Sequence, residues 1–233
     1  MRYLVCLLAL VAALPAVVAD AMAADGEPKK ALTKSGQSAA RSIVLKRADL
    51  GAGFTATMRP DDEPLPKGAR CDALDEGDLT VTGDANSPDF RLAQTGVYVT
   101  VGSSAQVYRT LRDANASWQR GTSRQVLNCL GDIVRLSAAQ GQKITVVSSK
   151  RISFPTVAPK TSAYRVVVTI APSGSSQRIR AYVDAVVLQR GKVQSVLLVT
   201  SLGRPVATAE RAALAAILAA RMARAAGPGG PVA

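Results

Sequence analysis

The sequence predicts an α+β fold, a three-layer α/β/α sandwich built on a largely antiparallel sheet. Its C-terminal half contains four strand-like segments in a row, at 144–154, 163–171, 179–189 and 193–201. The connections between them are short, and Arg190-Gly191-Lys192 is tight enough to force an antiparallel hairpin, so the four segments form a meander. Both faces of these strands are apolar, because Val183 and Val187 point one way and Val186 and Leu188 the other. Since an antiparallel sheet usually leaves one face in water, two apolar faces require helices on both sides.

The segments N-terminal to the meander supply further strands and the first helix. This helix is expected at about 38–48, where Ala40, Ile43 and Val44 share one side, and the glycines in 49–54 end it. Short strands are then expected at 54–58, 79–83 and 97–101.

Three more helices complete the two outer layers. One begins near Thr110, because Thr-Leu-Arg-Asp resembles a capping box. We expect Trp118 to anchor the inner face of this helix in the core, beside Leu111. The other two helices are expected at about 123–139 and 208–225.

The N-terminal residues have the features of a secretory leader. Arg2 is positively charged, and the apolar run Leu4–Leu14 is too short to cross a bilayer, which needs about 20 helical residues. Cleavage is expected after Ala19, with Ala23 as a second possible site. We therefore expect a secreted or envelope-associated protein with no membrane span after processing. The expected organisation is a signal peptide at 1–19, a flexible segment at 20–37, a single sandwich domain at 38–225 and a disordered tail at 226–233.

Two cysteines remain after removal of the leader, Cys71 and Cys129, 58 positions apart. In an oxidising compartment an even pair is most simply a disulfide. A redox couple would more often be a close Cys-x-x-Cys, and two thiolates without histidine are half of a zinc site. We expect a structural disulfide.

The composition restricts the possible functions. The chain has no histidine and a formal net charge of +12. A Ser-His-Asp triad is therefore excluded, and no cofactor is expected. The positive charge favours an anionic partner, and the partners we consider are a small ligand, an anionic envelope polymer or another protein. Nucleic acid is not expected, because aromatic residues make up only 4% of the chain and are not interleaved with the basic ones.

One cluster of carboxylates is a weak candidate for a calcium site. Hard oxygen ligands suit Ca²⁺, but the spacing here is not that of an EF-hand loop, and loop carboxylates often cap backbone N–H groups instead. We therefore expect no metal. The four residues are Asp72, Asp75, Glu76 and Asp78.

Three other charged residues are weak candidates for ligand binding. Asp184 lies within an apolar strand, where an unpaired charge is costly, so it requires either a ligand or an ion pair with a neighbouring strand, for which Arg165 is a candidate. Arg109 and Arg112 lie at the start of a helix, where their charge opposes the helix dipole. An outside partner or ordinary surface charge would explain them equally.

Several short motifs resemble those of a known group of exported actinobacterial proteins. They are Ala48–Phe54, Leu79–Gly83 with Ser87–Phe90, Asp113–Trp118 and Ala181–Asp184. The group is related to the extracellular sensor domain of a mycobacterial serine/threonine kinase and to small lipoproteins with a PsbP-like sandwich fold. The resemblance implies a ligand-sensing or protein-binding module of PsbP-like fold without an enzymatic role. The chain departs from the kinase sensor in having one cysteine pair where the sensor would carry two.

Two functions follow from these observations. The first is a secreted, non-enzymatic, sensor-like or binding domain at the cell exterior. The alternative is a histidine-free hydrolase of the envelope that uses carboxylates or a Ser-Lys dyad. The lysines considered for such a dyad are Lys143 and Lys150, which are better explained as charges at strand ends. Convergence of two carboxylates, or of a serine and a lysine, in one cleft would favour the enzyme. An apolar or basic groove without such convergence would favour binding.

Overall fold

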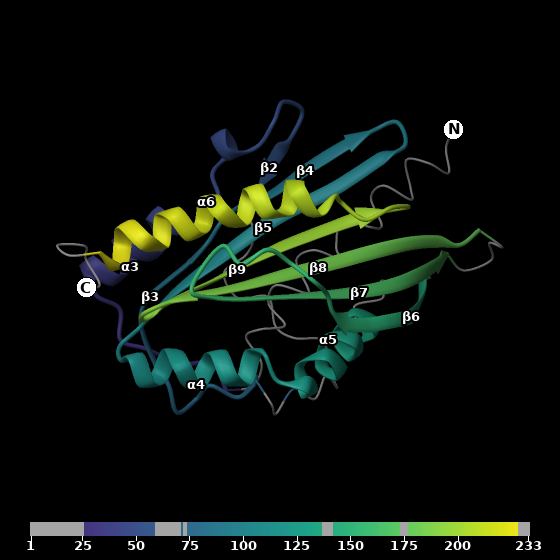
Figure 1. Ribbon diagram of the computed structural model, residues 1–233. Coiled ribbons are helices and arrows are strands. Elements are labelled where there is room, and N and C mark those ends of the chain that lie inside the picture. Colours follow the sequence, from purple (N-terminus) through teal and green to yellow (C-terminus); the bar gives the residue numbers. More distant parts are fainter. Residues whose placement is uncertain (1–25, 59–70, 72–73, 137–141, 173–176, 228–233) are drawn as a thin grey trace.

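The computed structural model describes residues 26–58, 71, 74–136, 142–172 and 177–227. In these residues a nine-stranded sheet lies between two layers of helices (Figure 1). The helices are α3 (Lys34–Ile43), α4 (Leu111–Gly121), α5 (Arg124–Leu136) and α6 (Thr208–Ala226), with a 3-10 turn η1 (Arg47–Asp49). The strands are β1 (Lys29–Lys30), β2 (Thr55–Thr57), β3 (Thr80–Asn86), β4 (Asp89–Gln94), β5 (Val97–Tyr108), β6 (Gln142–Arg151), β7 (Lys160–Pro172), β8 (Ile179–Arg190) and β9 (Val193–Leu202).

The strand order is β1-β3-β5-β9-β8-β7-β6, and among the described strands only the β1–β3 pair is parallel. The predicted C-terminal meander is confirmed as β6 to β9, and its last strand pairs along β5 from Val99 to Val107. On its other edge β5 pairs with β4 through its first half and with β3 through its second half. The predicted α/β/α sandwich with a largely antiparallel sheet is therefore confirmed.

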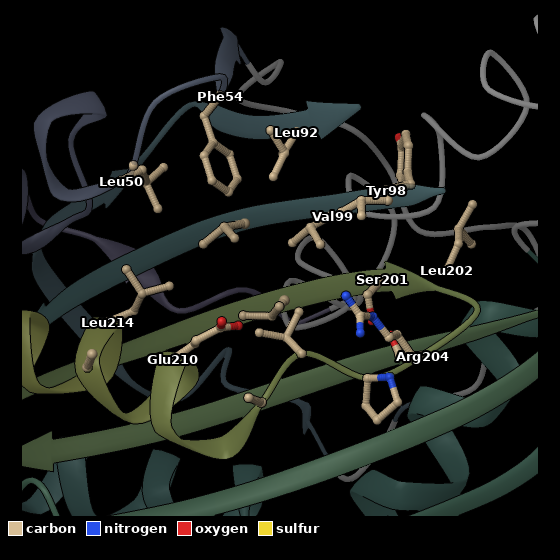
Figure 2. A pocket seen from close by; sticks show the side chains of 18 of the residues that line it. Leu50, Phe54, Leu92, Tyr98, Val99, Ser201, Leu202, Arg204, Glu210 and Leu214 are labelled. Atoms are coloured by element: carbon tan, nitrogen blue, oxygen red, sulfur yellow. The ribbon is translucent and has the colours of Figure 1, made fainter. Parts of the chain in front are cut away.

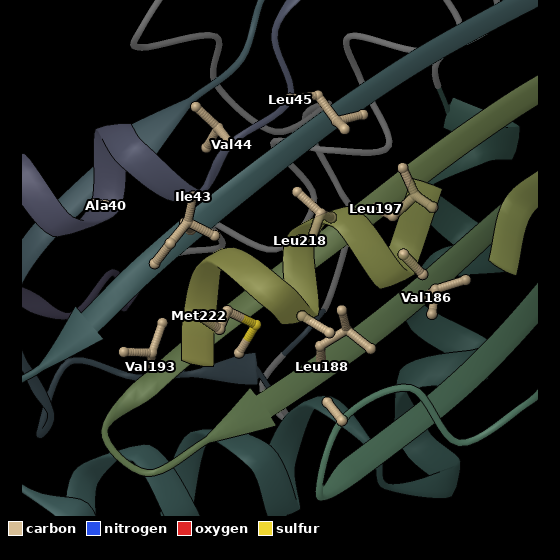
Figure 3. Close-up of a cluster of buried hydrophobic side chains, with 14 of the residues drawn as sticks. Ala40, Ile43, Val44, Leu45, Val186, Leu188, Val193, Leu197, Leu218 and Met222 are labelled. Carbon is tan, nitrogen blue, oxygen red and sulfur yellow. The ribbon is translucent and has the colours of Figure 1, made fainter. Parts of the chain in front are cut away.

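The first helical layer consists of α3 and α6, which lie against the same face of the sheet (Figure 1). Ile43 of α3 and Leu218 and Met222 of α6 are completely buried there (Figure 3). They pack on the inward-facing residues of β8 and β9, among them Leu188 and Leu197. This is the largest of the three hydrophobic clusters in the described residues, and it fixes the position of α6 over the meander.

The second layer consists of α4 and α5 on the opposite face (Figure 1). Val126 and Ile133 of α5 pack on Val168 of β7. The disulfide expected between Cys71 and Cys129 is present, with the two Cα atoms 5.2 Å apart, so it ties the segment before β3 to α5.

The ordered part begins earlier than the sequence predicted. The segment 20–37 was expected to be flexible, but β1 pairs with β3, and α3 starts at Lys34 because the Thr33 hydroxyl accepts a hydrogen bond from the Gly36 amide. The same helix ends at Ile43 rather than near residue 48, since Val44 has an extended backbone. At the other end, Ala226 belongs to α6 and not to the tail.

Two further differences concern β4 and α4. Strand β4 was not predicted as an element, and it forms a hairpin with β5 that carries β2 on its outer edge. In α4 the buried residues are Ala114, Ser117 and Gly121, whereas Leu111 is 53% exposed and Trp118 only partly buried. The inner face of α4 is thus made of small residues, and Trp118 is not the core anchor that we expected.

Several predictions fall on residues outside the described ranges. These are the signal peptide with its cleavage site at Ala19 or Ala23, the remainder of the tail at 228–233, and Asp72. Among the described residues, no helix combines the length and the apolar character needed to cross a bilayer.

Candidate functional site

A cavity with a volume of about 540 Å³ lies beside the N-terminal half of α6 (Figure 2). Its floor is formed by β5 and β9, and its far wall by β4 and the loop between η1 and β2. Most of the lining side chains are aliphatic or aromatic and many are only partly buried. The apolar lining residues include Leu50, Phe54, Leu92, Val97, Val99, Val206, Leu214 and Ile217.

Local sequence explains why this cavity forms. Gly96 at the β4–β5 turn has φ of 76°, a conformation that favours glycine, so the two strands fold back tightly. The pairing Ala56↔Phe90 then holds β2 on the outside of β4, which places Phe54 above the sheet. Gly203, with φ of 77°, turns the chain from β9 toward α6. Helix α6 therefore starts beside the end of β9, and its first turns face the β4–β5 hairpin across the cavity.

Polar groups are few and lie at the edges of the cavity. Arg204 lies beside Ser201 at one end, and Glu210 projects from α6 (Figure 2). Both side chains are exposed, and neither forms an ion pair within the described part of the chain. Asp49 also borders the cavity, but its two oxygens accept hydrogen bonds from Arg221 at 2.7 and 2.8 Å. Among the described residues that line the cavity, the charged groups without an ion pair are thus the cation of Arg204 and the anion of Glu210.

The cavity offers no activated nucleophile among its residues. The Ser201 hydroxyl donates to the carbonyl oxygen of Arg204 at 2.8 Å, and no lysine lines the cavity. Of its two carboxylates, Asp49 is neutralised by Arg221. A buried serine beside a base, or two unpaired carboxylates facing each other, would be needed for hydrolysis, and this geometry provides neither.

Asp184 is held in a buried cluster of two arginines. Arg165 Nε and Nη2 donate to the Asp184 carboxylate at 2.6 and 2.8 Å, and Arg211 Nη1 lies 3.3 Å from the same carboxylate. The Arg165 hydrogen bonds raise the pKa of that guanidinium, whereas burial lowers the pKa of Arg211. The Asp184 side chain is only 2% exposed. Its ion pair with Arg165 is the structural alternative considered from the sequence, and the cluster fixes the first turn of α6 to the sheet.

Arg109 and Arg112 lie apart from both Asp184 and the cavity. They are exposed at the N-terminal end of α4, on the opposite face of the sheet, and within the described residues neither side chain has an ion pair. The three ligand candidates predicted from the sequence are therefore not brought together.

The acidic cluster does not converge on a common point either. Asp75 accepts from the Gly77 amide, while Asp78 forms a bidentate ion pair with Arg120 that lowers the pKa of Asp78. Glu76 lies beneath α4, and burial raises its pKa although Ser117 and Tyr108 hydrogen bond to it. Asp72 lies outside the described ranges. Among the residues that are described, no three potential ligands are close enough together to hold a metal ion.

The lysines considered for a Ser-Lys dyad are both on β6. Lys143 and Lys150 are exposed, and in the described part of the chain neither forms a hydrogen bond with a serine. The Ser149 hydroxyl instead donates to the Leu127 carbonyl oxygen at 2.9 Å.

Sequence reasoning missed the cavity itself. Its walls come from β4, which was not predicted, from Leu50, which was assigned to a helix-ending loop, and from Phe54, which was placed where that loop meets a predicted strand. One available signal was the apolar content of that loop, since Leu50 and Phe54 flank three small residues and would be unusual in a fully solvated connection.

Comparisons with known proteins give a limited result. No protein-family model matches the sequence, and no curated protein matches it. Among solved structures, the chain is similar to the extracellular domain of PknH from Mycobacterium tuberculosis, with a TM-score of 0.43 and 12% sequence identity. The alignment covers 79% of this chain and 95% of that domain. A TM-score at this level does not establish a function, so the function is inferred from the residues of the cavity.

Proposed function

We propose that the protein is an extracytoplasmic, non-enzymatic binding domain that holds a small apolar or amphipathic molecule in the cavity beside α6. The observation that carries this proposal is the cavity of about 540 Å³ with its predominantly apolar, partly exposed lining. Small-molecule sites typically measure about 300–1,000 Å³ and combine an apolar lining with a few polar groups at defined places.

The energetics favour an apolar occupant. Leu50, Phe54, Leu92 and Leu214 all turn toward the cavity while remaining partly exposed to water (Figure 2). Covering apolar surface gains about 25 cal/mol per Å², so a ligand that fills the cavity would be stabilised by these side chains. Arg204 and Glu210 at the edge would interact with a polar end of the same molecule, and a single anionic group would pair with Arg204.

An exported location is supported by the Cys71–Cys129 bond, because structural disulfides persist mainly in oxidising compartments. Binding rather than catalysis is supported by the engaged Ser201 hydroxyl and the paired Asp49 carboxylate.

The test uses 8-anilinonaphthalene-1-sulfonate, an aromatic molecule with one anionic group, in a fluorescence titration of the folded protein. Ala213→Trp places a large side chain at the mouth of the cavity from an exposed position of α6. Ala216→Trp is the matched control, because Ala216 is also exposed on α6 but does not line the cavity. We expect saturable binding by the wild type and by Ala216→Trp, and an affinity at least about tenfold lower for Ala213→Trp, which corresponds to about 1.4 kcal/mol.

Equal binding by the two tryptophan variants would show that the probe does not use this cavity. Absence of saturable binding by the wild type would also contradict the proposal. Arg204→Gln should weaken binding of the sulfonated probe more than binding of a neutral aromatic probe. This difference separates the contribution of the polar contact from that of the apolar lining.

A further inference from the structure

A second surface feature lies on the outer side of α3, away from the apolar cavity. It is a shallow groove of about 620 Å³ formed by the end of the β1 segment, the exposed side of α3 and the residues that follow the helix. Its lining contains three basic residues and no acidic one. The complete lining is Leu32, Thr33, Lys34, Gln37, Ser38, Arg41, Ser42 and Lys46.

The three basic side chains are free to bind a partner. Lys34, Arg41 and Lys46 are all exposed, and in the part of the chain that the structure describes no carboxylate lies within 4.0 Å of their charged nitrogens. Other cations of the same region are engaged, as Lys30 pairs with Glu27 and Asp84, and Arg221 with Asp49. The groove therefore concentrates positive charge that the carboxylates of the described residues do not neutralise.

The stability of α3 does not account for this charge pattern. A cation in the last turn, as at Arg41, interacts favourably with the helix dipole, but Lys34 occupies the first turn, where a cation is unfavourable. The first turn also contains no acidic residue. An anion bound near Lys34 would be favoured both by the lysine and by the N-terminal end of the helix.

The spacing of the cations fits a chain of anions better than a single one. Lys34 and Arg41 are seven residues apart, which is two helical turns and about 10.5 Å along the axis. Lys46 follows three residues after the helix end at Ile43. Three cations spread over two helical turns and the segment that follows the helix match successive groups of an extended polymer better than they match one small anion. The exposed apolar surface in the groove is small, with Leu32 at 48% exposure, so insertion into a lipid layer has little support here.

We propose that the groove along α3 binds an extended anionic polymer, one that carries phosphate or carboxylate groups at regular intervals, through Lys34, Arg41 and Lys46. The hydroxyl of Ser38, which lies between the first two cations on the helix, donates to the same polymer. This site is separate from the apolar cavity and does not depend on its function.

The test uses long-chain inorganic polyphosphate as the probe and compares two triple variants of the full chain. Lys34→Gln, Arg41→Gln and Lys46→Gln together remove the groove charges. Lys143→Gln, Lys150→Gln and Arg151→Gln remove the same net charge from exposed positions on β6. Thermal melting of both variants verifies that they remain folded. Ala213→Trp, which closes the apolar cavity, should leave polyphosphate binding unchanged.

We expect the groove variant to lose at least about tenfold in polyphosphate affinity and the β6 variant to lose much less. Because each phosphate contact contributes about 0.7 to the slope of log affinity against log salt for a flexible strand, removal of three contacts should make the slope shallower by about two. Orthophosphate, at the same total concentration of phosphate groups, should compete only weakly with polyphosphate for the groove.

Three results would overturn the proposal. Equal losses in the two triple variants would show that only net charge matters. Competition by orthophosphate as strong as that by the polymer would indicate a single-anion site. Groove-dependent binding to vesicles of phosphatidylglycerol, without groove-dependent binding of polyphosphate, would indicate a lipid surface instead.

Discussion

Asp184 illustrates how this protein tolerates charge inside an apolar layer. A lone buried carboxylate would cost several kcal/mol, but Arg165 lies directly opposite in the β7–β8 register and donates two hydrogen bonds. Arg211 adds a second cation from α6 and contacts the Val206 carbonyl oxygen and the Thr208 hydroxyl. The cluster therefore links two strands to the start of the helix that borders the cavity.

Glu76 is another buried carboxylate, and among the described residues no cation forms a salt bridge with it. The Tyr108 hydroxyl, 3.0 Å away, bridges it to Ser117 of α4, and Arg120 acts on it from a greater distance through the field of its charge. Burial is the largest influence on Glu76, and it raises the pKa of this carboxyl in the folded protein above the usual 4.5.

This shift predicts an unusual pH dependence of stability. Between pH 4.5 and the raised folded pKa, the folded state holds a proton on Glu76 that the unfolded state has released, so the free energy of unfolding falls as pH rises. Glu76→Gln removes this effect. The gain in thermal midpoint of the variant over the wild type should therefore increase from pH 4 to pH 7, as measured by differential scanning calorimetry.

Asp78→Asn provides the control of opposite sign. The pKa of Asp78 is lowered by its hydrogen bonds with Arg120, so its contribution to stability is present above the unfolded pKa and is lost as pH falls. This variant should be less stable than the wild type at pH 7 and approach it at acid pH. Parallel pH profiles for the wild type and Glu76→Gln would disprove the assignment to Glu76.

At the scale of the elements, α3 is held to the sheet by a close approach of two glycines. A Cβ atom added at Gly83 of β3 would overlap the carbonyl oxygen of Gly36, and one added at Gly36 would overlap the carbonyl oxygen of Thr82. Gln37 also accepts a hydrogen bond from the Asp84 amide at 2.6 Å. The helix therefore rests directly on the backbone of β3.

Gly83→Ala should separate α3 from β3 and destabilise the protein by about 1–3 kcal/mol, the usual cost of overpacking. Gly51→Ala is the matched control, because a Cβ atom at Gly51 would meet nothing within 4 Å. Chemical denaturation should show a lower midpoint for the first variant and an unchanged or slightly higher one for the second. Equal stability of the two variants would contradict the close contact.

The elements also show what the sequence alone can predict. The meander was predictable because apolar residues fill both faces of four strands and Gly191 marks a tight turn, and the ion pair of Asp184 with Arg165 follows from that register. The start of α3 was missed because the segment before residue 38 is polar, whereas its order comes from pairing with β3 and from the Thr33 cap. The cavity was not predictable, since it depends on how β4 and α6 face each other across the sheet.

At the scale of the whole molecule, the sheet has two halves that meet along one seam. Strands β1 to β5 form one half and β6 to β9 the other, and the seam is the antiparallel pairing of β5 with β9. On one face α6 packs against α3 across the two halves, in the cluster that contains Ile43 and Met222. On the other face the disulfide connects the segment that precedes β3 to α5, which packs on β6 and β7.

Because the disulfide closes a loop of 58 residues across this seam, its removal should destabilise the whole molecule. The loop-entropy relation gives about 4 kcal/mol, or roughly 8–16 °C in thermal midpoint for a domain of this size. The double variant Cys71→Ser, Cys129→Ser avoids a free thiol and should melt at this lower temperature in one cooperative transition. Reductant should lower the wild-type midpoint to the same value and leave the double variant unchanged. Two separate transitions in the variant would mean that the β5–β9 seam and the α3–α6 contact do not couple the halves. A single transition would show that these contacts unite the sheet without the disulfide, which is the result expected if the bond acts on the unfolded chain.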